Sequence, residues 1–253
     1  MDSPAQISVA RTAIHFWTEA ASRVGRFAAT RALLAALWEF LRDSTPSRLR
    51  QRYGDADYDW DHRVNTTSAA VGWRDRLLGV LHSAYQPTDP AGFREMLDAL
   101  AEHSHLNFGD FTFLDLGSGK GRTLLMASDY PFRRILGVEL LPALHQIAQE
   151  NLRAYKNDSQ QCFALESLCA DATTFPFPEE PLVLYLFNPF GEPALRRVVS
   201  NLKQSVQANP RPVYVVYYNP LLEHVLAEGN FLRKVTGTHR YSVFRDQWSV
   251  ISC

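Results

Sequence analysis

Residues 111–123 read FTFLDLGSGKGRT, and this stretch constrains the fold more than any other part of the chain. It begins with an apolar run of the length expected for a strand buried on both faces. Glycines follow at positions 117, 119 and 121, and an apolar helical pattern resumes at Thr123. A strand, a glycine turn and a helix in this order bring backbone N–H groups and a helix N-terminus close to a ligand. The stretch therefore predicts a ligand-binding corner of an α/β fold.

The spacing of the glycines separates two classes of ligand. Dinucleotide-binding turns read G-x-G-x-x-G, and their third glycine lets the helix pack closely on the strand. Here that third position is Arg122, a bulky charged residue. Asp115 stands two residues before Gly117, and a fixed carboxylate suits a positively charged ligand better than a pyrophosphate. The alternative is an ordinary strand–turn–helix corner without a ligand.

The acid and the three glycines resemble motif I of the class I S-adenosylmethionine (SAM) methyltransferases. In that family the acid faces the ammonium group at the amino-acid end of the cofactor. The wider text FLDLGSGKGR, GVEL, ADA and YLFNPF looks like uncharacterised bacterial methyltransferases and is distantly similar to protein-lysine methyltransferases. The resemblance covers roughly residues 85–251. It implies a Rossmann-like α/β methyltransferase fold, with a seven-stranded, mostly parallel sheet, helices on both faces and SAM as the cofactor.

Strands and helices alternate along this region, as a doubly wound fold requires. The methyltransferase fold adds a terminal antiparallel pair of strands to such a sheet. We expect later strands at 134–139, 167–172, 181–187, 212–218, 231–235 and 241–251, and helices at 91–102, 141–155, 192–207 and 220–227.

Acids end the second and third expected strands. Glu139, 22 residues after Gly117, can accept hydrogen bonds from both hydroxyls of a ribose, as NAD-binding folds also arrange. Its alternative is a surface acid that caps the next helix. Asp171 and Ala172 match the methyltransferase position that reads adenine, although a lone aspartate there could be a simple cap. Because ligands of such sheets lie outside the carboxyl ends of the strands, Asp115, Glu139 and Asp171 predict an adenosine-type cofactor at that edge.

The fourth expected strand ends in Asn188-Pro189-Phe190-Gly191. This matches the position of the [Asn/Asp]-Pro-Pro-[Tyr/Phe] motif of amine-modifying methyltransferases, with one proline missing. By that resemblance, the Asn188 oxygen and a neighbouring carbonyl accept hydrogens from the target amine, and Phe190 stacks on the group that bears it. A turn built on Asn-Pro is the alternative. Residues 217–219, at the end of the fifth strand, are expected to border the same cleft.

A Tyr85-Gln86-Pro87-Thr88 segment precedes the core. Many class I methyltransferases carry a comparable aromatic-x-Pro-[Thr/Ser] segment that closes over the cofactor, and the alternative is a helix start. The resemblance thus implies cofactor contacts from Tyr85, Thr88, Asp115, Gly117, Ser118, Gly119, Gly121, Glu139, Asp171, Ala172 and Asn188, and catalytic roles for Asn188, Pro189 and Phe190. No metal is expected.

The first 84 residues carry no motif that we can assign. Residues 11–42 have an amphipathic helical pattern. The segment from Arg11 to Arg52 contains eight arginines and three acids, a net charge of 8 − 3 = +5. Three interpretations remain open: a helix packed on the domain, a surface for a membrane or an acidic partner, and an organelle-targeting peptide. We expect residues 1–84 to form a helical extension that shapes substrate access, and residues 85–253 to form the SAM-binding domain. A chain that begins near His82 is then expected to keep SAM binding.

Residues 53–73 show no regular pattern, and acids at 55, 57, 59 and 61 alternate with other residues. Alternating acids could bind a hard cation, but no glycine turn or distal glutamate completes a calcium loop. A solvated loop or a lid is the better interpretation, so this region is the candidate substrate gate.

The overall composition narrows the class of protein. The 253 residues are 46% hydrophobic and 21% charged, as in ordinary globular proteins. The net charge of −1 gives no strong nucleic-acid signal, and no apolar run is long enough to span a bilayer. Three cysteines without metal-type spacing suit a reducing compartment, so a cytoplasmic location is expected. Nothing predicts the oligomeric state.

Taken together, these patterns predict a SAM-dependent methyltransferase that acts on a nucleophile, a nitrogen of lysine or another amine in a protein or small molecule. Two alternatives remain. One is a protein with the SAM fold that binds without catalysis. The other is a nucleotide-dependent oxidoreductase, against which Arg122 argues.

Overall fold

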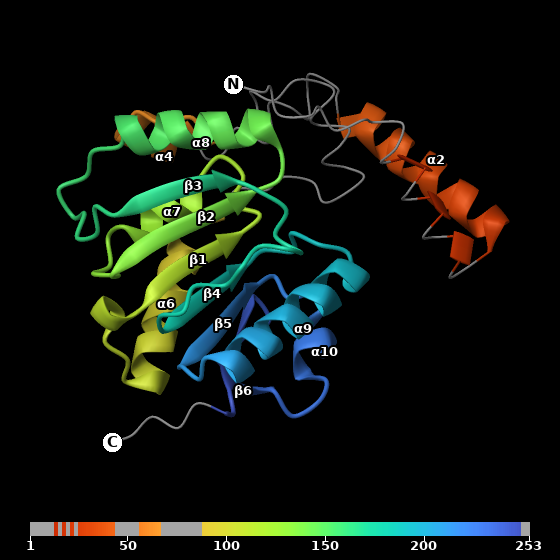
Figure 1. The fold of residues 1–253 in the computed structure, drawn as a ribbon. Helices are drawn as coiled ribbons and strands as arrows, with labels where there is room; N and C mark the ends of the chain where they lie inside the picture. The colour runs from red at the N-terminus through yellow and green to blue at the C-terminus, as the bar shows by residue number, and fades with distance from the viewer. Residues whose placement is uncertain are drawn as a thin grey trace, which may run out of the picture.

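The computed structural model describes residues 13–14, 17–18, 21–22, 25–43, 56–66 and 88–248. Its helices are α2 (Arg26–Asp43), α4 (Ala56–His62), α6 (Pro90–Ser104), the 3-10 helix η3 (Phe108–Asp110), α7 (Arg122–Ala127), α8 (Pro142–Ala154), α9 (Glu192–Ala208) and α10 (Glu223–Ala227). Its strands are β1 (Thr112–Leu116), β2 (Arg134–Glu139), β3 (Leu165–Cys169), β4 (Leu182–Leu186), β5 (Val213–Tyr218), β6 (Leu232–Gly237) and β7 (Tyr241–Asp246) (Figure 1).

A seven-stranded sheet forms the centre of the molecule, with the strand order β3-β2-β1-β4-β5-β7-β6. Strands β1 to β5 run parallel, and β7 lies antiparallel between β5 and β6. The predicted Rossmann-like methyltransferase fold is therefore confirmed. The expected strand at 167–172 begins earlier, at Leu165, and ends at Cys169; residues 249–251 of the expected last strand lie outside the described residues.

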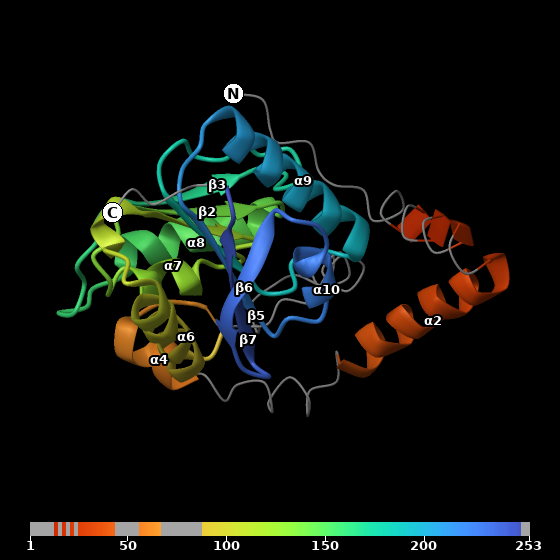
Figure 2. The same cartoon turned by 90° about the horizontal axis from the view of Figure 1, so that it is seen from below.

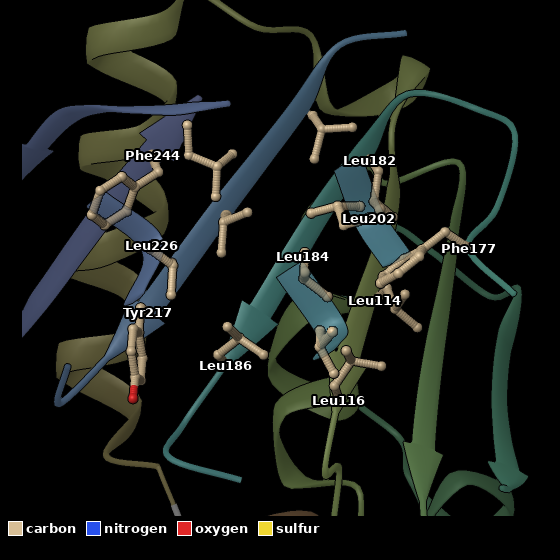
Figure 3. Close-up of a cluster of buried hydrophobic side chains, with 14 of the residues drawn as sticks. Leu114, Leu116, Phe177, Leu182, Leu184, Leu186, Leu202, Tyr217, Leu226 and Phe244 are labelled. Atoms are coloured by element: carbon tan, nitrogen blue, oxygen red, sulfur yellow. The ribbon is translucent and has the colours of Figure 1, made fainter. Parts of the chain in front are cut away.

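Helices cover both faces of the sheet, as Figures 1 and 2 show. On one face, α9 has apolar residues at helical spacing and packs on a cluster drawn in Figure 3, which includes Leu114, Leu184 and Leu202. On the other face, Phe93 of α6 and Leu124 of α7 pack against strand residues such as Tyr185. All five residues of β1 and of β4 are buried because they face a helical layer on each side.

The order of the strands sets the position of the ligand crevice. β1 pairs with β2 on one side and with β4 on the other, so the chain changes direction across the sheet at β1. In open α/β sheets, ligands bind outside the carboxyl ends of the strands at this switch point. The glycine turn begins there, directly after Leu116.

The N-terminal helices differ from expectation. Gly25, with φ +84, interrupts the helical pattern predicted over 11–42, and α2 begins after it. Leu34 and Trp38 are 61% and 68% exposed, and α2 stands away from the sheet (Figures 1 and 2). These two side chains therefore do not pack on the domain, as the first interpretation of residues 11–42 would require. None of the described helices is long and apolar enough to cross a membrane.

The candidate gate at 53–73 is also more regular than expected, because residues 56–62 form α4. His62 at the end of this helix stacks on Tyr155, which follows α8, and Tyr58 packs against the α6–α7 side of the core. The predicted domain boundary at residue 84 falls within residues 67–87, which lie outside the described residues, and it stays a prediction.

Candidate active site

The glycine turn after β1 has the backbone geometry that its sequence requires. Gly117, Gly119 and Gly121 have φ values of +87, +55 and +82, a left-handed conformation that side chains disfavour. The N–H groups of Gly117 and Ser118 donate to the carbonyl of Val138, at 2.8 and 3.1 Å. These bonds fasten the turn to the end of β2.

The turn lies directly against the Asn-Pro-Phe segment that follows β4. A Cβ atom added to Gly117 would lie 2.6 Å from Cβ of Pro189, closer than real Cβ atoms approach. Only glycine lets these two loops touch. The sequence motif expected to hold the cofactor and the motif expected to hold the acceptor are thus in van der Waals contact at one edge of the sheet.

Replacing Gly117 by alanine should therefore cost more than backbone strain alone. Gly229→Ala is a matched control, because Gly229 has φ +78 but no atom of the described chain within 4 Å of its added Cβ. Left-handed strain costs about 1–2 kcal/mol in either variant, and overpacking adds about 1–3 kcal/mol at Gly117. Urea unfolding should show the larger loss for Gly117→Ala; equal losses would contradict the tight contact with Pro189.

Asp115 is buried on β1 and accepts a hydrogen bond from the Thr123 hydroxyl of α7. Burial raises the pKa of this carboxyl to about 7, the Thr123 hydrogen bond opposes that rise, and the nearby charge of Glu139 adds to it. The carboxyl is therefore poised to ionise when a cation comes close.

Glu139, the last residue of β2, reaches across to the glycine turn. Its Oε2 accepts from the Gly119 N–H and its Oε1 accepts from the Leu141 N–H, both at 2.8 Å. Burial raises the pKa of Glu139, and these backbone hydrogen bonds counteract that rise. The carboxylate therefore ties the turn, β2 and the start of α8 together.

Asp171 and Ala172 follow β3 at the same edge. Oδ1 of Asp171 accepts from both the backbone N–H and the hydroxyl of Thr173, each at 2.8 Å. Ala172 is buried in the core cluster. Asp171 thus caps its own turn, which is the alternative interpretation given for it in the sequence analysis. Both of these hydrogen bonds use Oδ1.

Two other residues predicted to contact the cofactor, Thr88 and Ser118, are buried. Thr88 is buried, and its hydroxyl lies 2.8 Å from the Tyr185 hydroxyl. Ser118 is buried beneath the turn, where a Cβ added to Gly137 would lie 2.7 Å from its Oγ. Tyr85 lies outside the described residues.

Asn188 has an unusual backbone conformation, and each polar atom of its side-chain amide makes a hydrogen bond. Its φ is +45, although a proline follows it. Its Nδ2 donates to the Asn219 carbonyl at 2.6 Å, and its Oδ1 accepts from the Tyr217 hydroxyl at 2.6 Å. Phe190, two residues on, packs partly buried against the core cluster. The acceptor motif and the end of β5, both predicted to border the cleft, are therefore joined.

The sequence analysis placed residues 217–219 at the cleft but did not predict that Asn219 binds the Asn188 amide. Asn219 also has a left-handed backbone, with φ +49, and also precedes a proline. Strained residues of this kind concentrate at functional sites. The repeated Asn-Pro pair at the ends of β4 and β5 is the sequence signal that could have revealed it.

Metal binding finds no support in the part of the chain that the structure describes, where no group of three His, Cys, Asp or Glu side chains could hold a metal ion. Asp59, from the alternating acids, instead accepts hydrogen bonds from the backbone N–H and the hydroxyl of Thr66.

Residues 114–188 match the protein family described as "Methyltransferase domain". The matched segment begins inside β1 and ends at Asn188, so it spans the glycine turn, Glu139 and Asp171. This segment is under a third of the chain, and the seven-stranded sheet that contains it has the class I methyltransferase fold.

Solved methyltransferase structures resemble the chain weakly. An RNA methyltransferase from Salinibacter ruber, in complex with S-adenosyl-L-homocysteine, is 20% identical, with a TM-score of 0.42 over 66% of this chain and 95% of that one. A SAM-dependent methyltransferase from Aquifex aeolicus is 16% identical, with a TM-score of 0.43 over 63% and 98% of the two chains. A putative methyltransferase from Escherichia coli is 18% identical, with a TM-score of 0.43 over 64% and 89%. No curated protein matches the chain in sequence.

The site geometry of the methyltransferase fits SAM. The buried carboxyl of Asp115 complements a cationic ligand, and the acids at the ends of β2 and β3 supply acceptors for hydroxyl and amine groups.

Proposed function

We propose that the enzyme transfers the methyl group of SAM to a nitrogen nucleophile, a lysine amine or another flexible amine. The observation that carries the proposal is the position of Asn188. Its oriented amide stands at the end of β4, in the loop whose Pro189 touches the glycine turn. Oxygen acceptors in this position suit an amine, which brings N–H groups that need partners.

Methyl transfer requires the protein mainly to position the amine against the methyl group of SAM. SAM, when bound, supplies an electrophilic methyl group on a sulfonium. Asn188 Oδ1 and the carbonyl groups of the Asn-Pro-Phe loop would accept the amine hydrogens and hold its lone pair toward the cofactor. None of the groups placed here is a strong base, so the proton leaves the amine to water. The missing second proline favours a flexible amine over a flat base.

We assign the cofactor contacts as follows. Asp115 would pair with the ammonium group, Glu139 with the ribose hydroxyls, and Asp171 with the adenine amine, while the Ala172 N–H would donate to a ring nitrogen. Glu139 already accepts two backbone N–H groups, but each carboxylate oxygen has two lone pairs. Both oxygens therefore retain capacity for a ribose hydroxyl.

The pKa of about 7 at Asp115 predicts a pH-dependent affinity for SAM. The ammonium group pairs with the carboxylate, and the ionised fraction falls about fivefold between pH 7 and pH 6. SAM binding should weaken by the same factor, and calorimetry at pH 6.5 should detect a released proton as an enthalpy that varies with the buffer. Asp115→Asn should bind weakly with a flat pH profile; a flat profile in the wild type would contradict the assignment.

Asp115 has the opposite effect on folding without ligand, because its contribution to the unfolding free energy falls as the pH rises. Its pKa in the folded state lies above its unfolded value, so its contribution to the unfolding free energy is fully present below about pH 4. That contribution is lost as the pH rises through about 7.

The acceptor class can be tested by transfer of a tritiated methyl group from SAM to a cell extract. The extract would be separated into protein, RNA and small-molecule fractions, and the protein fraction hydrolysed in acid. The proposal expects acid-stable N-methyl groups on lysine or on a small amine. Label confined to RNA bases, or to base-labile methyl esters, would contradict it.

A further inference from the structure

Residues 56–66, here called the α4 segment, lie against the outer side of the glycine turn. The segment folds back on itself because Asp59 accepts the N–H of Thr66 at 2.8 Å and also its hydroxyl. Its contacts with the methyltransferase domain include those to Asn151 of α8 and to the two positively charged residues of the turn, Lys120 and Arg122.

Asn151 of α8 is the centre of these contacts. This side chain is 3% exposed. Its Nδ2 donates to the carbonyls of Asn65 and Lys120, both at 2.9 Å. Its Oδ1 accepts from the Asn65 N–H at 2.7 Å. One buried amide therefore connects the backbone of the α4 segment to the backbone of the glycine turn.

The side chain of Lys120 repeats this connection. Lys120 is 0% exposed, and its Nζ donates to Oδ1 of Asn65 at 3.1 Å. Burial lowers the pKa of Lys120 to about 8, against the opposing charge of Asp59. The backbone carbonyl of this turn residue thus binds Asn151, and its ammonium group binds Asn65.

Aromatic rings form the second half of the contact. The Arg122 guanidinium carbon lies 4.5 Å from the centre of the Tyr58 ring. His62 stacks between Tyr58 and Tyr155, with ring centres 4.4 and 5.5 Å apart. Arg122, which takes the place of the third glycine of a dinucleotide turn, therefore has a partner in the α4 segment.

We propose that Asn65 and Asn151 are positioning residues for the cofactor, so that docking of the α4 segment and binding of SAM favour each other. The inference rests on the proposed placement of SAM at the glycine turn. A turn with three left-handed glycines has much conformational freedom to lose, and these contacts fix the residue between its last two glycines. The N-terminal extension then contributes to SAM affinity, in contrast to the expectation for a chain that begins near His82.

Coupling between two binding events is reciprocal. If docking of the α4 segment strengthens SAM binding, SAM must strengthen docking by the same factor. A contact that only stabilises the fold would raise the melting temperature without this reciprocity.

Two measurements on the full chain test the inference. Asn65→Ala removes the Lys120 contact but leaves the backbone contacts to Asn151, so it should fold and should bind SAM about three- to tenfold more weakly. Asn151→Ala should have a larger effect, and Asp61→Ala, an exposed acid on the same helix, should have none. Hydrogen exchange of residues 56–66 in the wild type should slow by a similar factor when SAM is added.

The outcomes are distinguishable. The inference would be overturned if Asn65→Ala kept its SAM affinity and the hydrogen-exchange rate of residues 56–66 did not change when SAM is added. The cofactor site would then remain as proposed. Absence of SAM binding by the wild type would refute the cofactor placement itself. If Asn151→Ala does not fold, the other variant and the exchange experiment decide alone.

Discussion

Replacing Glu139 by alanine should weaken SAM binding about 10- to 160-fold, the effect of losing hydrogen bonds worth about 1.5–3 kcal/mol to a charged group. In the proposed complex its carboxylate accepts from the ribose. It also accepts from the Gly119 N–H, so its loss frees the glycine turn. Calorimetric titration with SAM measures the effect directly.

Glu166→Ala is the matched control for this experiment. Glu166 lies on the neighbouring strand β3, but its side chain is exposed. It should leave SAM affinity unchanged. Wild-type affinity in a folded Glu139→Ala variant would show that the carboxylate serves the helix start at Leu141 and not the cofactor.

Replacing Asn188 by glycine should lower turnover tenfold or more, about 1.4 kcal/mol of transition-state stabilisation, while SAM affinity stays nearly constant. Glycine tolerates the φ of +45 without strain, so this variant removes the amide without distorting the backbone. Single-turnover methyl transfer and SAM titration together separate the two effects.

His105→Gly controls for the change of a left-handed residue to glycine. His105 has φ +48 at the end of α6 and lies on the surface, so its replacement should change neither turnover nor SAM affinity. If Asn188→Gly loses stability but keeps turnover, Asn188 is a turn residue. The acceptor contacts would then lie at 217–219, where Tyr217 and Asn219 already bind its amide.

The central sheet could be predicted because its signals are local. Strands β1, β2, β4 and β5 each contain a short apolar run that leads to a glycine, an acid or Asn-Pro, and the structure has these strands in the predicted chain order. The close contact of Gly117 with Pro189 follows from the same reasoning, since β1 and β4 are neighbours. Periodicity and turn chemistry are sufficient for such features.

The other features of the site could not be predicted, because they depend on contacts between residues that lie far apart in the sequence. Nothing near Asn151 in the sequence shows that its amide joins Asn65 to Lys120, and the charge on Lys120 gave no sign of complete burial. The hydrophobic residues of α2 show the converse, because apolar spacing predicts an amphipathic helix but not what covers it. Their exposure in the described structure is a fact that only the fold supplies.

The most direct test of the central claim is calorimetric titration of the full chain with SAM, with its demethylated product and with NADH. The acids at the ends of β1, β2 and β3 predict that SAM and its product bind at one site and compete with each other, while NADH gives no heat of binding. Arg122, buried where a dinucleotide turn needs glycine, supports the same expectation. Binding of NADH without binding of SAM would contradict the account.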